Sequence, residues 1–119
     1  MRESDVKDCL FCKMIAREVP AKIIAESDTI FAFADIRPQA PHHVLIIPKT
    51  HINNINDLTP DNVSKIGDVL LAARDIAKTV GVSTSGFRLV FNTNADAGQS
   101  VFHIHAHFLA GRAMEWPPG

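Results

Sequence analysis

The stretch His103-Ile104-His105-Ala106-His107-Phe108-Leu109 places three of the six histidines of the chain at every second position. Side chains of a β-strand point alternately to its two faces, so this spacing predicts a strand, over 101–109, with the three imidazoles on one face. The residues between them are apolar and suit a face that packs on a core. The stretch therefore predicts a core strand that displays a row of imidazoles.

Three interpretations of this row are open: chance placement on a solvated face, a metal site and a catalytic site. Strict alternation of half of the histidines disfavours chance. At a rise of about 3.3 Å per residue, the Cα atoms of His103 and His107 lie roughly 13 Å apart, so one zinc ion cannot readily take all three rings. A neutral imidazole attacks phosphorus near neutral pH, and a flanking imidazolium stabilises phosphate charge. The catalytic interpretation is favoured.

The turn Ala97-Gly98-Gln99-Ser100 leads into this strand. Glycine allows a backbone to approach a ligand closely, and successive N–H groups form a nest for anions. Ser100 adds a hydroxyl donor. An ordinary loop is the alternative for this segment alone, but beside the histidines it suggests a phosphate-binding turn.

Patterns elsewhere in the chain predict two helices and four more strands. A short helix over 9–17 has Asp8 as its cap, and a long helix begins with Thr59 as cap, Pro60 in its first turn, and stops at Gly81. The expected strands cover 22–26, 29–35, 43–48 and 87–92. This order predicts an α+β fold in one domain over 1–119: an antiparallel five-stranded sheet, one long helix and a short N-terminal helix.

Composition limits the partners and the compartment. The chain has 119 residues, a net charge of −1 and no basic stripe, so we expect no nucleic-acid partner. It has no apolar run long enough to cross a bilayer, and residues 1–5 lack the apolar start of a signal peptide, so we expect a cytoplasmic protein without a membrane partner. In a reducing compartment, the pair Cys9 and Cys12 favours metal or redox chemistry over a structural disulfide.

The histidine stretch resembles the signature of the histidine triad (HIT) superfamily, H-ψ-H-ψ-H-ψ-ψ with ψ apolar. Further segments resemble its Hint branch, and the resemblance runs from about Cys9 to Gly119. These segments are Asp35–Pro41, Leu45–Lys49, Gly98–Val101, Gly111-Arg112 and Trp116–Gly119. Arg37 departs from the pattern, because a serine is frequent there beside the implied ribose site.

The resemblance implies a homodimer that binds purine nucleotides and hydrolyses nucleoside 5′-phosphoramidates. It implies that His105 is the nucleophile, that His107 contacts the phosphate with Ser100 nearby, and that His43 buttresses the triad. The implied nucleotide-binding residues are Leu10, Phe11, Phe33, Asp35, Ile36, Asn92, Gly98, Gln99, Ser100, Val101, His105 and His107. Asp35 as a turn cap, Phe11 and Phe33 as plain core, and His43 as a satisfied buried histidine are the alternatives.

Other HIT proteins with C-x-x-C bind zinc through it, together with a K-x-H histidine and the first triad histidine. The resemblance thus implies a structural zinc on Cys9, Cys12, His51 and His103, with no catalytic metal. A reduced, metal-free cysteine pair is the alternative, and a thiol redox role is weaker because no thioredoxin-like βαβ unit follows.

Two rival functions stay open at this stage. One is a dinucleoside polyphosphate hydrolase or nucleotidyl transferase of the same superfamily, against which the Hint-like tail argues. The other is a nucleotide- or zinc-binding interaction module with incidental hydrolysis, which the intact histidine row disfavours.

Overall fold

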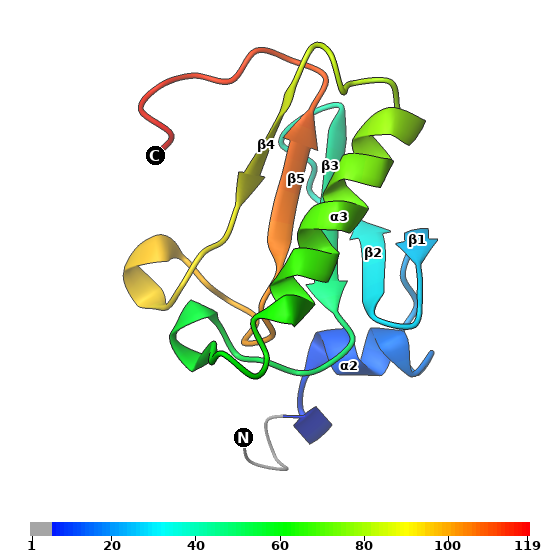
Figure 1. Cartoon of the computed structure of the whole chain (residues 1–119), viewed down its shortest axis with the longest axis vertical. Coiled ribbons are helices and arrows are strands. Elements are labelled where there is room, and N and C mark those ends of the chain that lie inside the picture. The colour runs from blue at the N-terminus through cyan, green and yellow to red at the C-terminus, as the bar shows by residue number, and fades with distance from the viewer. Residues whose placement is uncertain (1–5) are drawn as a thin grey trace.

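In the computed structural model, which describes residues 6–119, an antiparallel five-stranded sheet carries one long helix across a face (Figure 1). The strands are β1 (Ile23–Glu26), β2 (Ile30–Ala34), β3 (His42–Pro48), β4 (Phe87–Val90) and β5 (Ala106–Ala110), in the order β1-β2-β3-β5-β4. The helices are α2 (Leu10–Ile15) and α3 (Ser64–Thr79), with 3₁₀ turns η1 (Ile55–Asp57) and η2 (Ala95–Ala97). The expected α+β fold is confirmed.

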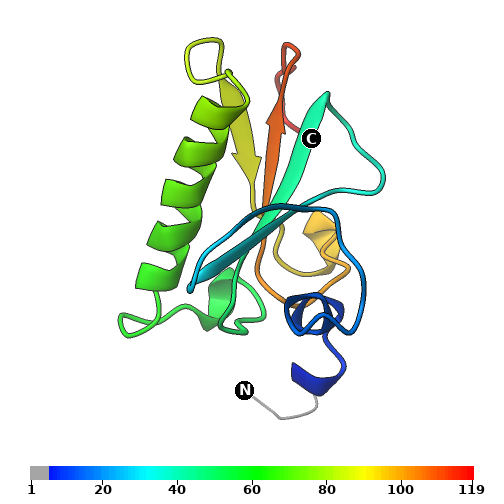
Figure 2. The ribbon, with the colours of Figure 1, turned by 90° about the vertical axis from the view of Figure 1, so that its right-hand side faces the viewer.

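Strand β3 is apolar along most of its length because both of its faces are buried. Val44 and Ile46 belong to the cluster that α3 covers, whereas Leu45 and Ile47 belong to a second cluster with Phe11 of α2. Figure 2 shows α3 along one side of the sheet and α2 near one end of the strands, away from α3. The sheet therefore has a helix-covered face and a second face on which a site is built.

Two helix starts differ from the sequence-based expectation. Cys9, rather than Asp8, caps α2, and its Sγ accepts from the Cys12 backbone N–H at 3.3 Å. Helix α3 begins at Ser64, because Thr59 and Asn62 close a separate turn: each side-chain oxygen accepts from the backbone N–H of the other. Side chains that bond nearby backbone compete with a helix in this way.

The expected stop of α3 is confirmed. Gly81 follows the last turn with a φ of +77°, the left-handed conformation that commonly ends helices at glycine. No helix within residues 6–119 combines the length and apolar character that crossing a membrane requires. The signal-peptide expectation rests on residues 1–5, which lie outside the described part.

The histidine strand is shorter than predicted. Strand β5 begins at Ala106, and residues 101–105 follow an irregular path in which the Ile104 N–H donates to the Ile52 carbonyl at 2.6 Å. Strand β4 likewise ends at Val90 rather than at residue 92. Only His107 of the three histidines therefore lies in a regular strand, and the orientation of the other two depends on their individual contacts.

Candidate functional site

A cavity of about 510 Å³ opens on the sheet face away from α3. It is lined by residues from α2, β2, β3, β5 and the loops that join them. Eleven of the twelve residues predicted to bind nucleotide line it: Leu10, Phe11, Phe33, Asp35, Ile36, Asn92, Gly98, Ser100, Val101, His105 and His107. Six lining residues had not been predicted: Met14, Pro20, Ala21, Lys22, Ala34 and Leu45. Most of these are apolar positions, where sequence alone does not separate pocket from core.

Gln99 is the predicted residue that does not line the cavity. Its side chain is buried, and its amide nitrogen donates to the Asn53 and Val101 carbonyls at 2.8 and 3.2 Å. Its amide oxygen accepts from the Asn94 backbone and the Asn54 side chain at 2.9 and 3.2 Å. Gln99 thus holds the turn in place, while Gly98, at a φ of +80°, and Ser100 face the cavity.

A hydrogen bond to the backbone of the preceding segment holds the ring of His105. Its Nδ1 lies 2.8 Å from the His103 carbonyl oxygen, which can only accept, so Nδ1 carries a proton and donates. In the neutral ring, Nε2 therefore keeps a free lone pair. Burial lowers the pKa of His105 below its ordinary value, which favours the neutral ring. Among the described residues, His105 is thus a buried imidazole with a free nitrogen in the cavity wall.

Two hydrogen bonds, from Gln39 to His43 and from His43 to His107, fix which nitrogen of His107 carries its proton. The Gln39 backbone N–H donates to His43 Nδ1 at 3.0 Å, so neutral His43 has its proton on Nε2. That atom lies 2.9 Å from His107 Nδ1 and donates to it, which leaves the proton of neutral His107 on Nε2. Burial and the neighbouring His105 and His43 lower the pKa of His107 to about 4. His107 is thus a neutral N–H donor in the cavity wall, where the sequence suggested an imidazolium.

Asp35 fits both interpretations offered from the sequence. Its Oδ1 accepts from the Arg37 backbone N–H at 2.7 Å, which makes it a turn cap, and the residue also lines the cavity. Its Oδ2 lies 3.6 Å from His43 Nε2, and burial lowers the pKa of His43 although this carboxylate opposes the effect. His43 is buried and hydrogen-bonded, and it reaches the cavity only through His107.

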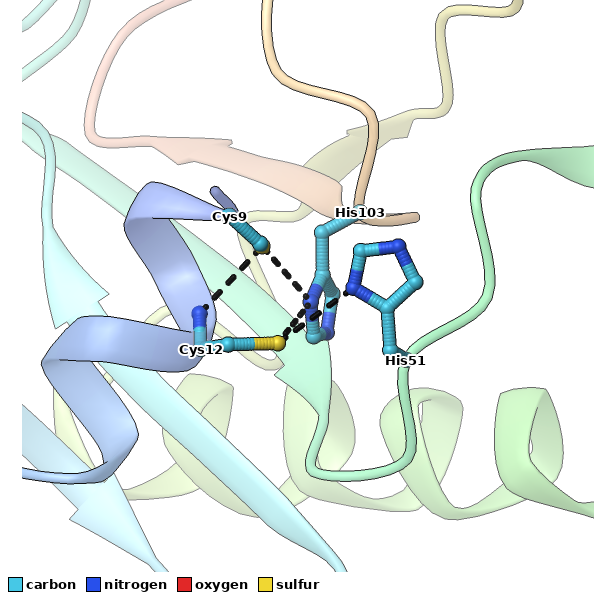
Figure 3. Close-up of side chains that lie close together, drawn as sticks. All are labelled: Cys9, Cys12, His51 and His103. Atoms are coloured by element: carbon cyan, nitrogen blue, oxygen red, sulfur yellow. Dashed lines mark hydrogen bonds between the residues drawn. The ribbon is translucent and has the colours of Figure 1, made fainter. Parts of the chain in front are cut away.

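Cys9, Cys12, His51 and His103 come together beside this cavity (Figure 3), and their ligand atoms all lie within 4.8 Å of one another. His103 Nδ1 is 3.4 and 3.5 Å from the two sulfurs, and His51 Nδ1 is 3.3 Å from Cys12 Sγ. The predicted four residues are therefore clustered by the fold, although they come from three separate segments.

The donor set of this cluster fits zinc. The Nε2–H groups of His103 and His51 donate to the Pro48 carbonyl and to Asn53 Oδ1 at 2.7 and 2.8 Å, which leaves both Nδ1 lone pairs toward the sulfurs. Such outer partners are typical of zinc-bound histidines, and two thiolates with two imidazoles suit tetrahedral zinc. Without a metal, burial and the neighbouring Cys9 raise the pKa of Cys12 to about 12. A bound cation would remove that penalty by holding the thiolate.

Asp35, His43 and His107 form a second group with metal-ligating atoms. The tautomer of His43 argues against a metal there. Binding through Nε2 would move the ring proton to Nδ1, where it would face the Gln39 N–H. This group is better suited to fix the tautomer of His107 than to hold an ion.

Comparison with known proteins gives these residues a context. The HIT domain family matches residues 16–114. The purine nucleoside phosphoramidase of Escherichia coli K12 is 42% identical over 108 residues, which cover 91% of this chain and 91% of that protein. An uncharacterized HIT-like protein of Synechocystis sp. is 46% identical over 113 residues, 95% of this chain and 98% of that protein.

Solved structures agree with these relatives. A HIT family hydrolase from Legionella pneumophila has a TM-score of 0.92 and 52% identity, covering 94% of this chain and 100% of that chain. A HIT family hydrolase from Clostridium thermocellum has a TM-score of 0.89 and 43% identity, covering 92% of this chain and 95% of that chain. The resemblance inferred from the sequence is confirmed.

Proposed function

Because this chain belongs to the HIT family, we propose that it hydrolyses purine nucleoside 5′-phosphoramidates to the nucleoside monophosphate and an amine. One observation carries the proposal. The hydrogen bond from His105 Nδ1 to the His103 carbonyl leaves the other ring nitrogen unprotonated in a cavity of nucleotide size. The phosphoramidase relative supports the choice of substrate class.

The reaction has two displacements at phosphorus. His105 Nε2 attacks the α-phosphorus, the P–N bond breaks, and the amine leaves with a proton from water or a neighbouring group. Water then attacks the nucleotidyl-histidine and returns a proton to the group that protonated the amine, the P–N bond to the ring breaks, and the nucleoside monophosphate is released. His105 regains its neutral form at the end of the cycle.

The cavity offers donors where the charge of the phosphoryl group develops. The Nε2–H of neutral His107 and the hydroxyl of Ser100 would stabilise that charge, which is usually a large catalytic effect. The anion nest expected from the sequence is not open at Gly98 and Gln99, because their N–H groups donate to the Ala95 and Asn94 carbonyls at 3.0 and 3.1 Å. The apolar part of the wall, with Leu10 and Phe11 of α2, suits a purine base. Asp35 and Asn92 are the polar residues proposed to hold the ribose.

We assign Cys9, Cys12, His51 and His103 to one zinc ion, which when bound supplies a structural cross-link. Four protein ligands leave no open coordination position, so no step of the reaction is assigned to it. Elemental analysis of protein purified without chelator should find about one zinc per chain. Well below one zinc would overturn the assignment.

We propose that two copies of the chain form a homodimer. Trp116 of the C-terminal tail is 82% exposed in the single chain, and such a large ring favours burial against a partner. Sedimentation at micromolar concentration should show a dimer, and a monomer would contradict the proposal.

A side-by-side assay tests the substrate class. We expect fast turnover of a fluorogenic adenosine 5′-phosphoramidate and much slower turnover of a dinucleoside polyphosphate, both without added metal. A reversed preference would favour the polyphosphate hydrolase alternative. Binding of adenosine monophosphate without turnover of either compound would favour an interaction module.

A further inference from the structure

We propose that Phe11 is a positioning residue for His105, and that the Cys9, Cys12, His51 and His103 cluster fixes Phe11 in that role. The inference rests on the proposed function, because it assumes that His105 is the reacting group. It gives the cluster an effect on the rate although no step of the reaction takes place there.

The need for such positioning follows from the backbone. His105 precedes the first residue of β5, so the sheet hydrogen bonds that fix a strand residue do not fix this one. Three ring contacts take their place. The first is the hydrogen bond to the His103 carbonyl, and the second is the edge-on packing of Phe11, with ring centroids 5.2 Å apart and planes at 88°. The third is the His107 ring, with centroids 5.0 Å apart.

The first two of these contacts come from residues in or next to the cluster. Phe11 lies between the two cysteines in the sequence, in a helix of six residues, which is too short to be stable by itself. Cys9 caps this helix through its sulfur, and Cys12 lies on the next turn beside His51 and His103. His103 contributes its ring to the cluster and its carbonyl to His105. A metal that joins α2 to His103 therefore holds two of the three contacts of the His105 ring.

Phe33 provides a matched control for Phe11. Each phenylalanine is 4% exposed, each lines the cavity, and the two rings pack together at 5.2 Å. Phe11 contacts the rings of His105 and His103, whereas the aromatic neighbours of Phe33 within residues 6–119 are Phe11 and Phe31. Loss of base contact should therefore appear in both variants, and loss of positioning only in one.

The first test compares Phe11→Leu with Phe33→Leu in the zinc-loaded full chain. We expect Phe11→Leu to lower kcat about 10- to 100-fold, the scale seen for a reacting group displaced by about 1 Å, and to raise KM about as far as Phe33→Leu does. Phe33→Leu should raise KM and leave kcat nearly unchanged. Equal kcat values in both variants and the unmodified protein would overturn the proposal.

The second test does not depend on activity. Nitrogen-15 NMR of the zinc-loaded protein should show a slowly exchanging proton on His105 Nδ1, in keeping with its bond to the His103 carbonyl. In zinc-loaded Phe11→Leu this signal should broaden or exchange faster, while in Phe33→Leu it stays sharp. An unchanged signal in Phe11→Leu would overturn the positioning role even if the protein hydrolyses phosphoramidates. If the His105 signal broadens in Phe11→Leu but neither the variants nor the unmodified protein hydrolyse the phosphoramidate, the positioning role of Phe11 stands and the proposed substrate class is wrong.

Removal of zinc from the unmodified chain links the effect to the cluster. We expect kcat to fall about as far as in Phe11→Leu, the His105 signal to broaden, and added zinc to restore both. Folded zinc-free protein, verified by circular dichroism, that keeps kcat and a sharp His105 signal would contradict the role of the cluster. Should the zinc-free chain unfold, the zinc-loaded variants still decide the role of Phe11.

Discussion

His103 and His107 flank His105 at equal distance in the sequence, yet the fold turns their rings to opposite uses. His103 has no exposed surface, donates from Nε2 to the Pro48 carbonyl and presents Nδ1 to two sulfurs. His107 is half-buried, accepts at Nδ1 from His43 and keeps an Nε2–H in the cavity wall. One ring is thus prepared to bind a metal and the other to donate to a ligand.

The pKa does not distinguish these two histidines. Burial is the main cause that lowers the pKa of each to about 4, so both rings are neutral near pH 7. The difference lies in which nitrogen a neighbour occupies, because that choice decides whether a lone pair or a proton remains for the function. A histidine row therefore specifies its chemistry only together with its carbonyl and imidazole neighbours.

The largest expected effect is on the rate, from replacing His105, which lies between His103 and His107. His105→Asn should lower kcat by about 10⁶, the loss measured when an essential nucleophile is removed from a hydrolase. Binding of adenosine monophosphate, measured by calorimetry, should stay within a few-fold. His42→Asn is the control, because His42 lies in β3 outside the cavity wall. A His105→Asn variant with full activity would refute the assignment.

At the metal end, His103→Asn should remove tightly bound zinc and destabilise the fold. A ligand present at about 100 to 1,000 times its Kd stabilises by about 3–4 kcal/mol, so we expect Tm to fall by about 10 °C or more. His107→Asn should keep its zinc and lose little in Tm. Equal zinc content and Tm in the two variants would remove the distinction between the two ends.

A smaller effect, on zinc affinity, is expected from Asn53, which contacts the proposed ligand His51. Asn53→Ala removes the acceptor for His51 Nε2–H but no metal ligand, and should weaken zinc affinity about 10- to 100-fold. Asn56→Ala, on the exposed turn nearby, should leave the affinity unchanged. Competition with a fluorescent chelator measures both. If Asn53→Ala matches Asn56→Ala, His51 does not depend on this acceptor.

The smallest expected effect is the contribution of His107 to the loss of stability in acid. The unfolded His107 takes up a proton near pH 6.5, whereas the folded residue stays neutral down to about pH 4. The stability that this difference contributes is complete above pH 6.5 and is lost as the pH falls toward 4. Urea midpoints between pH 6.5 and 4.5 should therefore fall less steeply in His107→Asn than in the unmodified chain. Both proteins have the same zinc ligands, so the effect of acid on zinc binding is common to both. Parallel slopes would contradict the burial argument.

The sequence predicted the architecture well because apolar alternation and turn residues dictate it. Strands β1, β2 and β3, the end of α3 and the five-stranded sheet follow from such local patterns. The predicted starts of α2 and α3 were wrong. The Cys9 sulfur replaces Asp8 as the cap of α2, and Thr59 closes a separate turn with Asn62 instead of capping α3. Strand alternation also placed His103 and His105 in a strand that begins only at Ala106.

The candidate site was predictable as a set of residues but not as a set of roles. Gln99 was grouped with the cavity, yet its amide holds the turn through contacts with Asn53, Asn54 and Asn94, which lie far away in the sequence or offer no pattern. The tautomers of the histidines were also beyond reach. The tautomers depend on the carbonyls of Pro48 and His103 and on the Gln39 N–H. Because these are backbone groups, the residue types in the sequence do not predict the contacts.

The central claim is that His105, between the two differently used histidines, carries the nucleotide during turnover. Rapid quenching of the reaction with adenosine 5′-phosphoramidate, followed by peptide mass spectrometry, tests it most directly. The account predicts a nucleotidyl adduct on His105 that appears within one turnover and decays as the monophosphate forms. An adduct on His103, His107 or Ser100, or single-turnover product formation at full rate without any adduct, would contradict it.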